Sequence, residues 1–197
     1  RFYLFFLSVK IQSSMKKWKI EDKILLKNLK IFDLYQYKLV SPYSIKEKKS
    51  FDFFVFNSVD WINVLPITKS GEVVFVEQYR PGTDSITLEL PGGMANKNEE
   101  PIESAKRELV EETGFSMGSW SNLGVVHPNP AILNNECHTF LALDVEEVSS
   151  HQNAGSEYTQ IKFIKLEDLD KMVIEGKITH SLVINAIYWY NLYNKNG

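Results

Sequence analysis

The sequence contains a single cysteine, Cys137, among its 197 residues. One cysteine excludes a disulfide within the chain and argues against a zinc site built from cysteines. Such sparing use of cysteine is typical of proteins of a reducing compartment, so we expect a cytoplasmic protein. Cys137 itself lies in the apolar stretch CHTFLAL and is interpreted as a strand residue.

Long apolar runs are also missing. A helix that spans a bilayer needs about 20 consecutive apolar residues, and no segment reaches that length, so no membrane partner is expected. The stretch FYLFFL after Arg1 is too short to span and lacks the small-residue cleavage site of a signal peptide. Because Met15 opens an ordinary stretch, MKKWKI, we expect residues 1–14 to be a non-native or upstream segment.

Charge is divided unevenly along the chain. Residues 1–50 hold 12 Lys and Arg against 4 Asp and Glu, whereas the remaining residues hold 10 against 21. The amino-terminal lysines are scattered among aromatic residues without a recognisable base-stacking module, which favours solvated strand faces over nucleic-acid binding. The acidic remainder suits metal binding better than nucleic acid.

The distribution of β-branched and aromatic residues predicts an α/β protein. Segments rich in these residues and bounded by Gly, Pro, Asp or Ser predict strands: FDFFVFNSV, INVLPIT, GEVVFVEQYR, SITLELP, CHTFLALDV and YTQIKFIKL. Two later segments, LEDLDKMVIEGK and ITHSLVINAIYWYNLY, predict helices, the second with apolar residues at helical spacing. We expect a mixed sheet between helices in residues 57–197, preceded by a β-rich element in residues 15–56.

The stretch GGMANKNEEPIESAKRELVEETGF, residues 92–115, crowds acidic residues around one arginine. Pro101 suits the first turn of a helix, and Gly114 suits the position just past its end, so a loop beginning at Gly93 followed by a helix is predicted. Residues three and four apart share a helix face, so Glu108 meets both other carboxylates of the stretch ELVEE. Such a face is unfavourable unless it is neutralised, and carboxylate oxygens are the ligands that Mg²⁺ prefers.

The same stretch carries a resemblance to a known family. From Gly93, five residues lead to Glu99 and seven more to Arg107, which opens the run RELVEETGF ending at Phe115. This pattern resembles a complete Nudix box. The resemblance implies an α/β/α sandwich that hydrolyses a nucleoside diphosphate linked to another group, with Mg²⁺ or Mn²⁺ as cofactor.

The resemblance also implies roles for the box residues. Glu108 and Glu112 are the first candidates for metal ligands, Glu111 follows, and the backbone carbonyl of Gly92 can complete the set. The remaining box positions are implied to be structural supports. Glu99 and Arg107 match positions that pair with each other and fix the loop to the helix. Gly93 and Gly114 lie at the two ends of this loop and helix.

Two stretches before the box point to one branch of the family. VEQYRPG followed by LELPGG resembles the ADP-ribose and nucleoside diphosphate sugar branch, in which the arginine matching Arg80 reaches substrate. Pro130 lies fifteen residues past Phe115, near a position associated with ADP-ribose activity, although Pro128 leaves the count ambiguous. The alternative to substrate contact is that Arg80 only forms a surface salt bridge. Glu89 either supports the site from its strand or faces solvent.

The general base is left open between three carboxylates. The family resemblance places it in a mobile loop beyond the box, and the flexible stretch SSHQNAGSEYTQ has Glu157 as its one carboxylate. Glu111 in the box and Glu136 in NNECH are the alternatives to Glu157. The histidines are interpreted as ordinary polar residues rather than ligands: His127, His138, His151 and His180.

The expected function is therefore Mg²⁺-dependent hydrolysis of ADP-ribose to AMP and ribose 5-phosphate, or of a related nucleoside diphosphate sugar. A hydrolase of another nucleotide sugar, such as a GDP-hexose or a UDP-sugar, is one alternative, and a ligand-sensing module without turnover is another. The intact set of box carboxylates argues against the second alternative. The β-rich segment 18–56 resembles the part that pairs two subunits in this branch, so we expect a homodimer.

Overall fold

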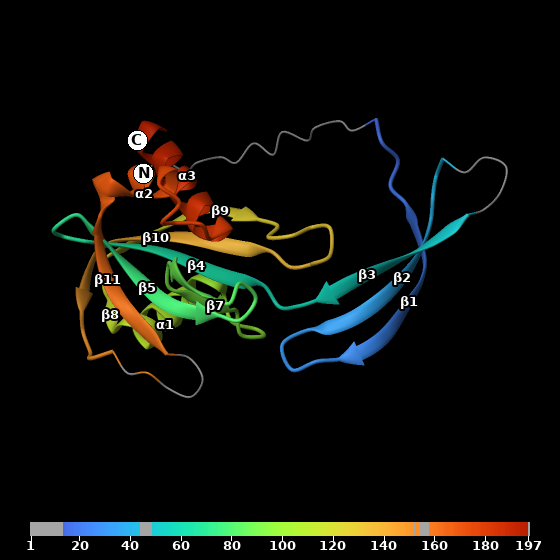
Figure 1. Cartoon of the computed structure of the whole chain (residues 1–197), viewed down its shortest axis with the longest axis horizontal. Helices are drawn as coiled ribbons and strands as arrows, with labels where there is room; N and C mark the ends of the chain where they lie inside the picture. Colours follow the sequence, from blue (N-terminus) through green and yellow to red (C-terminus); the bar gives the residue numbers. More distant parts are fainter. Residues whose placement is uncertain (1–13, 44–48, 152, 154–157, 197) are drawn as a thin grey trace. The chain divides into compact units, whose positions relative to one another are not determined.

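The computed structural model divides the chain into two compact units, residues 1–56 and 57–197 (Figure 1). It describes residues 14–43, 49–151, 153 and 158–196. Residues 1–13 and the candidate base Glu157 therefore lie outside the described residues. Within the described part, no helix combines the length and the apolarity that crossing a membrane requires.

The first unit is a sheet with strand order β1-β2-β3. Its strands are β1 (Lys19–Asn28), β2 (Asp33–Val40) and β3 (Ser50–Asn57). β1 and β2 are antiparallel, with two register shifts along β1. The aromatic rings of Trp18 and Phe51 lie 5.6 Å apart between centroids, and those of Phe32 and Phe56 lie 4.7 Å apart. None of the residues described in this unit is buried within the chain.

The second unit is built on an eight-stranded mixed sheet with the path β11-β5-β4-β10-β8, to which β6, β7 and β9 are added at β5, β4 and β10. Only the β4–β10 pair is parallel among the described pairings. The strands are β4 (Trp61–Thr68), β5 (Glu72–Arg80), β6 (Ser85–Glu89), β7 (Gly92–Met94), β8 (Phe115–Ser116), β9 (Ser119–Val126), β10 (Cys137–Glu147) and β11 (Thr159–Lys165). The helical elements are α1 (Pro101–Thr113), η1 (Leu166–Asp168), α2 (Leu169–Ile174) and α3 (Ser181–Asn196).

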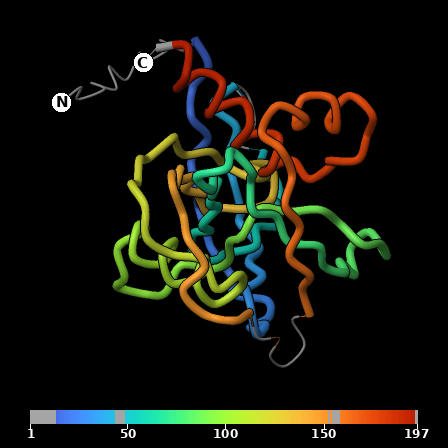
Figure 2. Tube along the Cα trace, turned by 90° about the vertical axis from the view of Figure 1, so that its left-hand side faces the viewer, coloured from blue at the N-terminus to red at the C-terminus, as the bar shows by residue number. Residues whose placement is uncertain are grey.

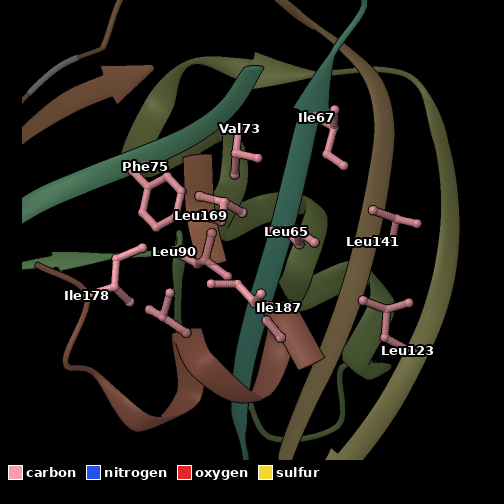
Figure 3. Packing of buried hydrophobic residues seen from close by; sticks show 12 residues of the cluster. Leu65, Ile67, Val73, Phe75, Leu90, Leu123, Leu141, Leu169, Ile178 and Ile187 are labelled. Carbon is pink, nitrogen blue, oxygen red and sulfur yellow. The ribbon is translucent and has the colours of Figure 1, made fainter. Parts of the chain in front are cut away.

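Helices cover both faces of this sheet. Successive strand side chains point to opposite faces, and in β5 Val73 and Phe75 pack in one core cluster while Val74 packs in the other. The first cluster includes Leu169 and Ile187 from α2 and α3 (Figure 3). The second includes residues of α1, so segment 101–113 and segment 169–196 lie on opposite sides of the strands (Figure 2). The predicted α/β/α sandwich is confirmed.

The predicted elements differ from the structure at three places. Gly93 was expected to begin a loop but lies in β7, because Gly92 and Gly93 pair with the start of β4. The helix expected over residues 166–177 is a 3₁₀ turn followed by the short α2, since Gly176 takes a left-handed φ of 70°. β9 was missed, because its sequence SWSNLGVV lacks a regular apolar alternation and only its pairing with β10 marks it as a strand.

The end of α1 agrees with the sequence and generates a prediction. Gly114 has a φ of 73° and its N–H donates to the Val110 carbonyl, as a left-handed helix end requires. A Cβ at this position would also collide with the Ser149 carbonyl. Gly114→Ala should therefore suffer both left-handed strain, about 1–3 kcal/mol, and a steric clash.

A matched control separates the two effects. Gly71 has a φ of 80° with nothing within 4 Å of a built Cβ, so Gly71→Ala suffers the strain alone. Urea unfolding of both variants should give Gly114→Ala the larger loss of unfolding free energy. Equal losses would show that the approach of Ser149 to the helix end is unimportant.

Candidate functional site

The box begins where the sheet splits between two strands. β6 pairs with the end of β5, and β7 pairs with the start of β4, so the chain passes from one strand to the other just before the box helix. A Cβ on Gly92 would collide with the carbonyl oxygen of Ile62 across the β4–β7 pair. Glycine at this position therefore lets the loop lie directly on β4, which fixes its backbone in front of α1.

Two box carboxylates face this glycine pair. The N–H of Gly92 donates to Oε2 of Glu112 at 2.9 Å. A Cβ built on Gly93 would lie 2.8 Å from the carboxyl carbon of Glu108. Glu108 and Glu112 are one helical turn apart, so both carboxylates project from α1 toward the same piece of backbone.

Arg107 contacts three of the box carboxylates, Glu99, Glu108 and Glu111. Its Nη1 donates to Glu108 at 2.8 Å and to Glu111 at 2.9 Å, and its Nε lies 3.5 Å from Oε2 of Glu99. The Glu99–Arg107 pair is thus present, and Ser104 also donates to Glu99 at 2.6 Å. Burial alone would lower the pKa of Arg107, but the hydrogen bonds and charges of Glu108 and Glu111 raise it. The hydrogen bond from Ser104, with Arg107 adding to it, lowers the pKa of Glu99.

The donor set fits a hard divalent cation. Glu108, Glu111 and Glu112 offer carboxylate oxygens from consecutive turns of one helix, and Gly92 offers a backbone carbonyl from the facing loop. The two glycines leave the space in front of Glu108 and Glu112 without side chains of their own. Oxygen-only sets of this kind suit Mg²⁺ or Mn²⁺ rather than softer metals.

Arg80 and Glu89 form a second cluster, at the ends of β5 and β6 that precede the box. Arg80 donates to Glu89 through Nε at 2.7 Å and through Nη2 at 2.8 Å, and Thr87 adds a third hydrogen bond at 2.5 Å. The carboxylate also lies 3.6 Å from Nε2 of His180. Glu89 is only 4% exposed, so the interpretation of a solvent-facing strand residue is wrong. Its role is to hold Arg80, whose side chain is 45% exposed.

The pKa of Glu89 reflects opposing effects. Burial alone would raise it, but hydrogen bonds from Arg80 and Thr87, and the charges of His180 and Arg80, bring the pKa below its ordinary value. A carboxylate that stays ionised in a buried position keeps a fixed geometry around its arginine. The involvement of His180 was missed in the sequence, because it stands ninety-one residues further along the chain and no local pattern connects the two.

The other candidate residues lie elsewhere. Pro130 is exposed in the turn between β9 and β10. Glu136 belongs to a third cluster, in which Nε2 of His138 lies 3.7 Å from Asp60 and 4.0 Å from Glu136, and the three ligand-type atoms lie within 4.8 Å of one another. Next to it, burial and then the charge of Asp60 raise the pKa of Cys137 to about 12. Glu136 therefore lies beside His138, and Cys137 is a buried thiol that stays protonated near neutral pH.

The Arg80–Glu89 pair generates a prediction about acid stability. A carboxyl whose pKa is lowered by folding stabilises the folded state above its unfolded pKa, and this stabilisation is lost as the pH falls through the lowered folded value. Glu89→Gln should lower the unfolding free energy at pH 7 by roughly 1.5–3 kcal/mol, the range for hydrogen bonds to charged groups. The difference from wild type should shrink below about pH 4.

Urea unfolding across this pH range tests it, with Glu77→Gln as control. Glu77 pairs with Lys162 on the surface, both side chains being more than a third exposed, so that variant should cost less than about 1 kcal/mol. A pH-independent difference for Glu89→Gln would contradict the lowered pKa.

A family model described as NUDIX domain matches residues 57–182. The chain is 25% identical over 178 residues to an ADP-ribose pyrophosphatase of Bacillus subtilis, which covers 88% of this chain and 94% of that protein. It is 30% identical over 150 residues to an ADP-sugar pyrophosphatase of Mus musculus, covering 71% and 69%. It is 25% identical over 170 residues to a GDP-mannose pyrophosphatase of Klebsiella pneumoniae, covering 81% and 83%.

A solved structure agrees in fold. The crystal structure of an ADP compounds hydrolase superposes with a TM-score of 0.79 at 17% identity, covering 93% of this chain and 97% of that one. At this identity the likeness concerns the fold alone.

Proposed function

The chain belongs to the Nudix family, and from that premise we propose that it hydrolyses the diphosphate bridge of ADP-ribose or a related nucleoside diphosphate sugar. The products would be a nucleoside monophosphate and a sugar phosphate. The observation that carries this proposal is the convergence of Glu108 and Glu112 on the glycine backbone of a complete box. Relatives described as ADP-ribose and ADP-sugar pyrophosphatases support the substrate class. A relative described as a GDP-mannose pyrophosphatase keeps another nucleotide sugar as the second candidate.

The chemistry requires positive charge beside the diphosphate. Its phosphorus atoms are surrounded by anionic oxygens, and a divalent cation would neutralise them and polarise the bridge. Glu108, Glu112, Glu111 and the carbonyl of Gly92 would hold the cation, and we assign Mg²⁺, with Mn²⁺ as a substitute. Gly92 and Arg107 orient the carboxylates before any substrate arrives, so the site has little reorganisation to undergo.

Arg80 would bind the substrate directly. Its Nε and Nη2 are held by Glu89, while the side chain remains partly exposed. A guanidinium fixed along one edge presents its charge to phosphate in a defined orientation. Pro130 is proposed to shape the substrate pocket from the turn before β10.

The general base is proposed to be Glu157. Glu111 accepts a hydrogen bond from Arg107, and Glu136 lies beside His138. Both alternatives therefore already have a side-chain partner in the second unit. The loop composition around Glu157 supports the same choice. We place the protein in the cytoplasm on the ground of its single cysteine.

The function is tested by a substrate panel with Mg²⁺ or Mn²⁺, containing ADP-ribose, other ADP-sugars, GDP-mannose and UDP-sugars, with products identified chromatographically. Wild type should release AMP and ribose 5-phosphate from ADP-ribose. Glu112→Gln removes one ligand charge with little change of shape and should lose at least about 100-fold in kcat, since metal supplies most of the charge stabilisation.

Glu103→Gln is the matched control, because Glu103 is on the same helix but forms an exposed pair with Lys106. This variant should keep near-normal activity. Near-normal Mg²⁺-dependent activity of Glu112→Gln would remove Glu112 from the metal site. Turnover of no nucleotide sugar would overturn the proposed function.

The first unit supports a homodimer. A small sheet is stable only when one face packs against something, yet the residues described in this unit are all at least partly exposed. Large apolar side chains on its strands are between 41% and 53% exposed: Ile20, Ile24, Leu25, Leu26, Phe51, Phe53 and Phe54. We propose that a second copy of the chain covers this surface, with aromatic residues of the unit reaching the partner's base pocket.

Light scattering tests the assembly. Wild type should have twice the 22.7 kDa mass of one chain, and Leu25→Asp should shift the equilibrium to monomer by placing a charge in an apolar interface. Ser119→Asp adds the same charge at an exposed polar position of the second unit and should remain dimeric. A monomeric mass for wild type at high concentration would refute the dimer.

A further inference from the structure

The carboxylate of Glu89 has a supporting group on each of its two oxygens. Oε1 accepts hydrogen bonds from Nε of Arg80 at 2.7 Å and from Oγ1 of Thr87 at 2.5 Å. Oε2 accepts a hydrogen bond from Nη2 of Arg80 at 2.8 Å, and Nε2 of His180 lies 3.6 Å from it. Each oxygen therefore meets one guanidinium nitrogen and one further group, which comes from β6 on one side and from the start of α3 on the other.

The bidentate pair needs these further groups in order to keep one direction. Two parallel hydrogen bonds fix the carboxylate and the guanidinium relative to each other. The terminal torsion of a glutamate side chain is only weakly restrained by itself, so Arg80 and the carboxylate could turn together as a unit. Thr87 and His180 contact opposite oxygens, and together they fix the plane of the carboxylate relative to the sheet and α3.

His180 makes this contact through one ring nitrogen. A carboxylate oxygen only accepts hydrogen bonds, so the nitrogen that faces it, Nε2, carries the proton. Nδ1 is buried and has no hydrogen-bond partner among the described residues. Within the described part of the chain, the acidic group that the imidazole faces is therefore the carboxylate of Glu89.

The backbone on either side of His180 is fixed by the core. Ile178 and Val183 are each 1% exposed and belong to the first core cluster. The N–H groups of Val183 and Ile184 donate to the His180 carbonyl at 3.1 Å and 3.2 Å, where α3 begins. The imidazole therefore extends from a backbone that has little freedom to move.

A buried amide attaches the first turn of α3 to β4. Asn63 is 5% exposed, and its Nδ2 donates to the carbonyl of Leu182 at 2.9 Å. In the sheet, Asn63 pairs with Gly92, whose N–H donates to Glu112. The start of α3 thus contacts β4 through Asn63 and the end of β6 through Glu89, which lie on the two sides of the split in the sheet.

We propose that His180 is a positioning residue of the hydrolytic site. It holds Oε2 of Glu89, and through Glu89 it sets the direction in which Arg80 presents its guanidinium to a phosphate group of the substrate. His180 itself needs no contact with the substrate. The inference rests on the proposed function and on Arg80 as its phosphate-binding residue. It gives a role to a histidine that the sequence analysis interpreted as an ordinary polar residue.

The first experiment measures kcat and KM with a nucleotide sugar that the panel identifies. His180→Ala removes the support of Oε2 and should raise KM roughly 5- to 20-fold, part of the effect of losing a hydrogen bond to a charged group. The value of kcat should change by less than about threefold, because the loss affects substrate and transition state alike. Thr87→Val removes the support of Oε1 and should change KM in the same direction. The Mg²⁺ concentration for half-maximal activity should stay within about twofold of wild type, since the carboxylates that suit Mg²⁺ lie on α1.

Three further variants are controls. His180→Gln keeps an N–H near the Nε2 position and should hold KM within about threefold of wild type. Ser181→Ala alters the exposed neighbouring residue and should match wild type. Gly71→Ala introduces strain at the opposite end of β5 from Arg80, and it should also keep the wild-type KM. This last variant separates a loss of stability from a displacement of Arg80.

A double-mutant cycle and a spectroscopic measurement decide whether His180 acts through Arg80. In the Arg80→Ala background, His180→Ala should raise KM by less than about a further twofold, because the group that it positions is absent. The Nε–H signal of Arg80 in a ¹H–¹⁵N spectrum is assigned by its loss in Arg80→Ala. Its exchange with water should be at least about fivefold faster in His180→Ala than in wild type, since an ion pair that can turn protects the N–H less. This measurement requires neither substrate nor metal.

The contrary outcomes are distinguishable from one another. A wild-type KM for His180→Ala, or an equal rise of KM in both backgrounds, overturns the positioning role and leaves the proposed function intact. Unchanged exchange at Nε–H of Arg80 shows that Glu89 holds the arginine without His180, and it overturns the proposal whether or not a substrate is turned over. A wild type that hydrolyses no member of the panel overturns the proposed function and the substrate role of His180 with it. If urea unfolding shows that His180→Ala is not folded, His180→Leu fills the same space without a donor and replaces it in each measurement.

Discussion

The repulsion among the carboxylates of α1 is the constraint on which the site depends. Glu108, Glu111 and Glu112 lie about one turn apart on α1, and their repulsion is offset by a cation of the same helix and by a backbone N–H of β7. Arg107 joins two of the carboxylates, and the backbone N–H of Gly92 meets the third. That N–H belongs to β7, which pairs with β4. The neutralisation of the Glu112 carboxylate therefore depends on how the sheet splits in front of α1. A cation in the same place would complete that balance.

Glycine performs different physical tasks at the two ends of the box helix. At Gly92 the backbone must approach the β4 carbonyl closely, and any side chain would push the loop away. At Gly114 the backbone must turn left-handed and also accept two N–H groups from the segment after β10. The first task places the backbone of β7 against β4, and the second fixes residues 148 and 149 at the end of the helix. The helix between them is the rigid element that relates the two.

The sequence predicted the features that depend on residues close together in the chain. The helix from Pro101 to Thr113, its glycine end and most strands of the second unit follow from spacing and composition, and the box resemblance identified the carboxylates. The partners of Glu89 could not be found in this way, because His180 reaches it from the start of α3, far along the chain. The hydrogen bond between Asn63 and Leu182 is equally invisible, since it depends on how α3 packs against β4. β9 and β7 depend on pairing with neighbours rather than on their own residues.

The polar clusters around Glu89, the box carboxylates and His138 differ in how firmly burial and contacts hold their side chains. Glu89 is buried with three partners, Arg80, Thr87 and His180, and its carboxylate can therefore hold Arg80 firmly. The side chains of the box carboxylates Glu108 and Glu111 are more exposed than that of Glu89. Asp60 and Glu136 are nearly half exposed and lie 3.7 Å and 4.0 Å from His138, so this cluster has longer contacts than the other two. Burial therefore constrains the Arg80–Glu89 pair most, because the buried carboxylate accepts hydrogen bonds from two guanidinium nitrogens.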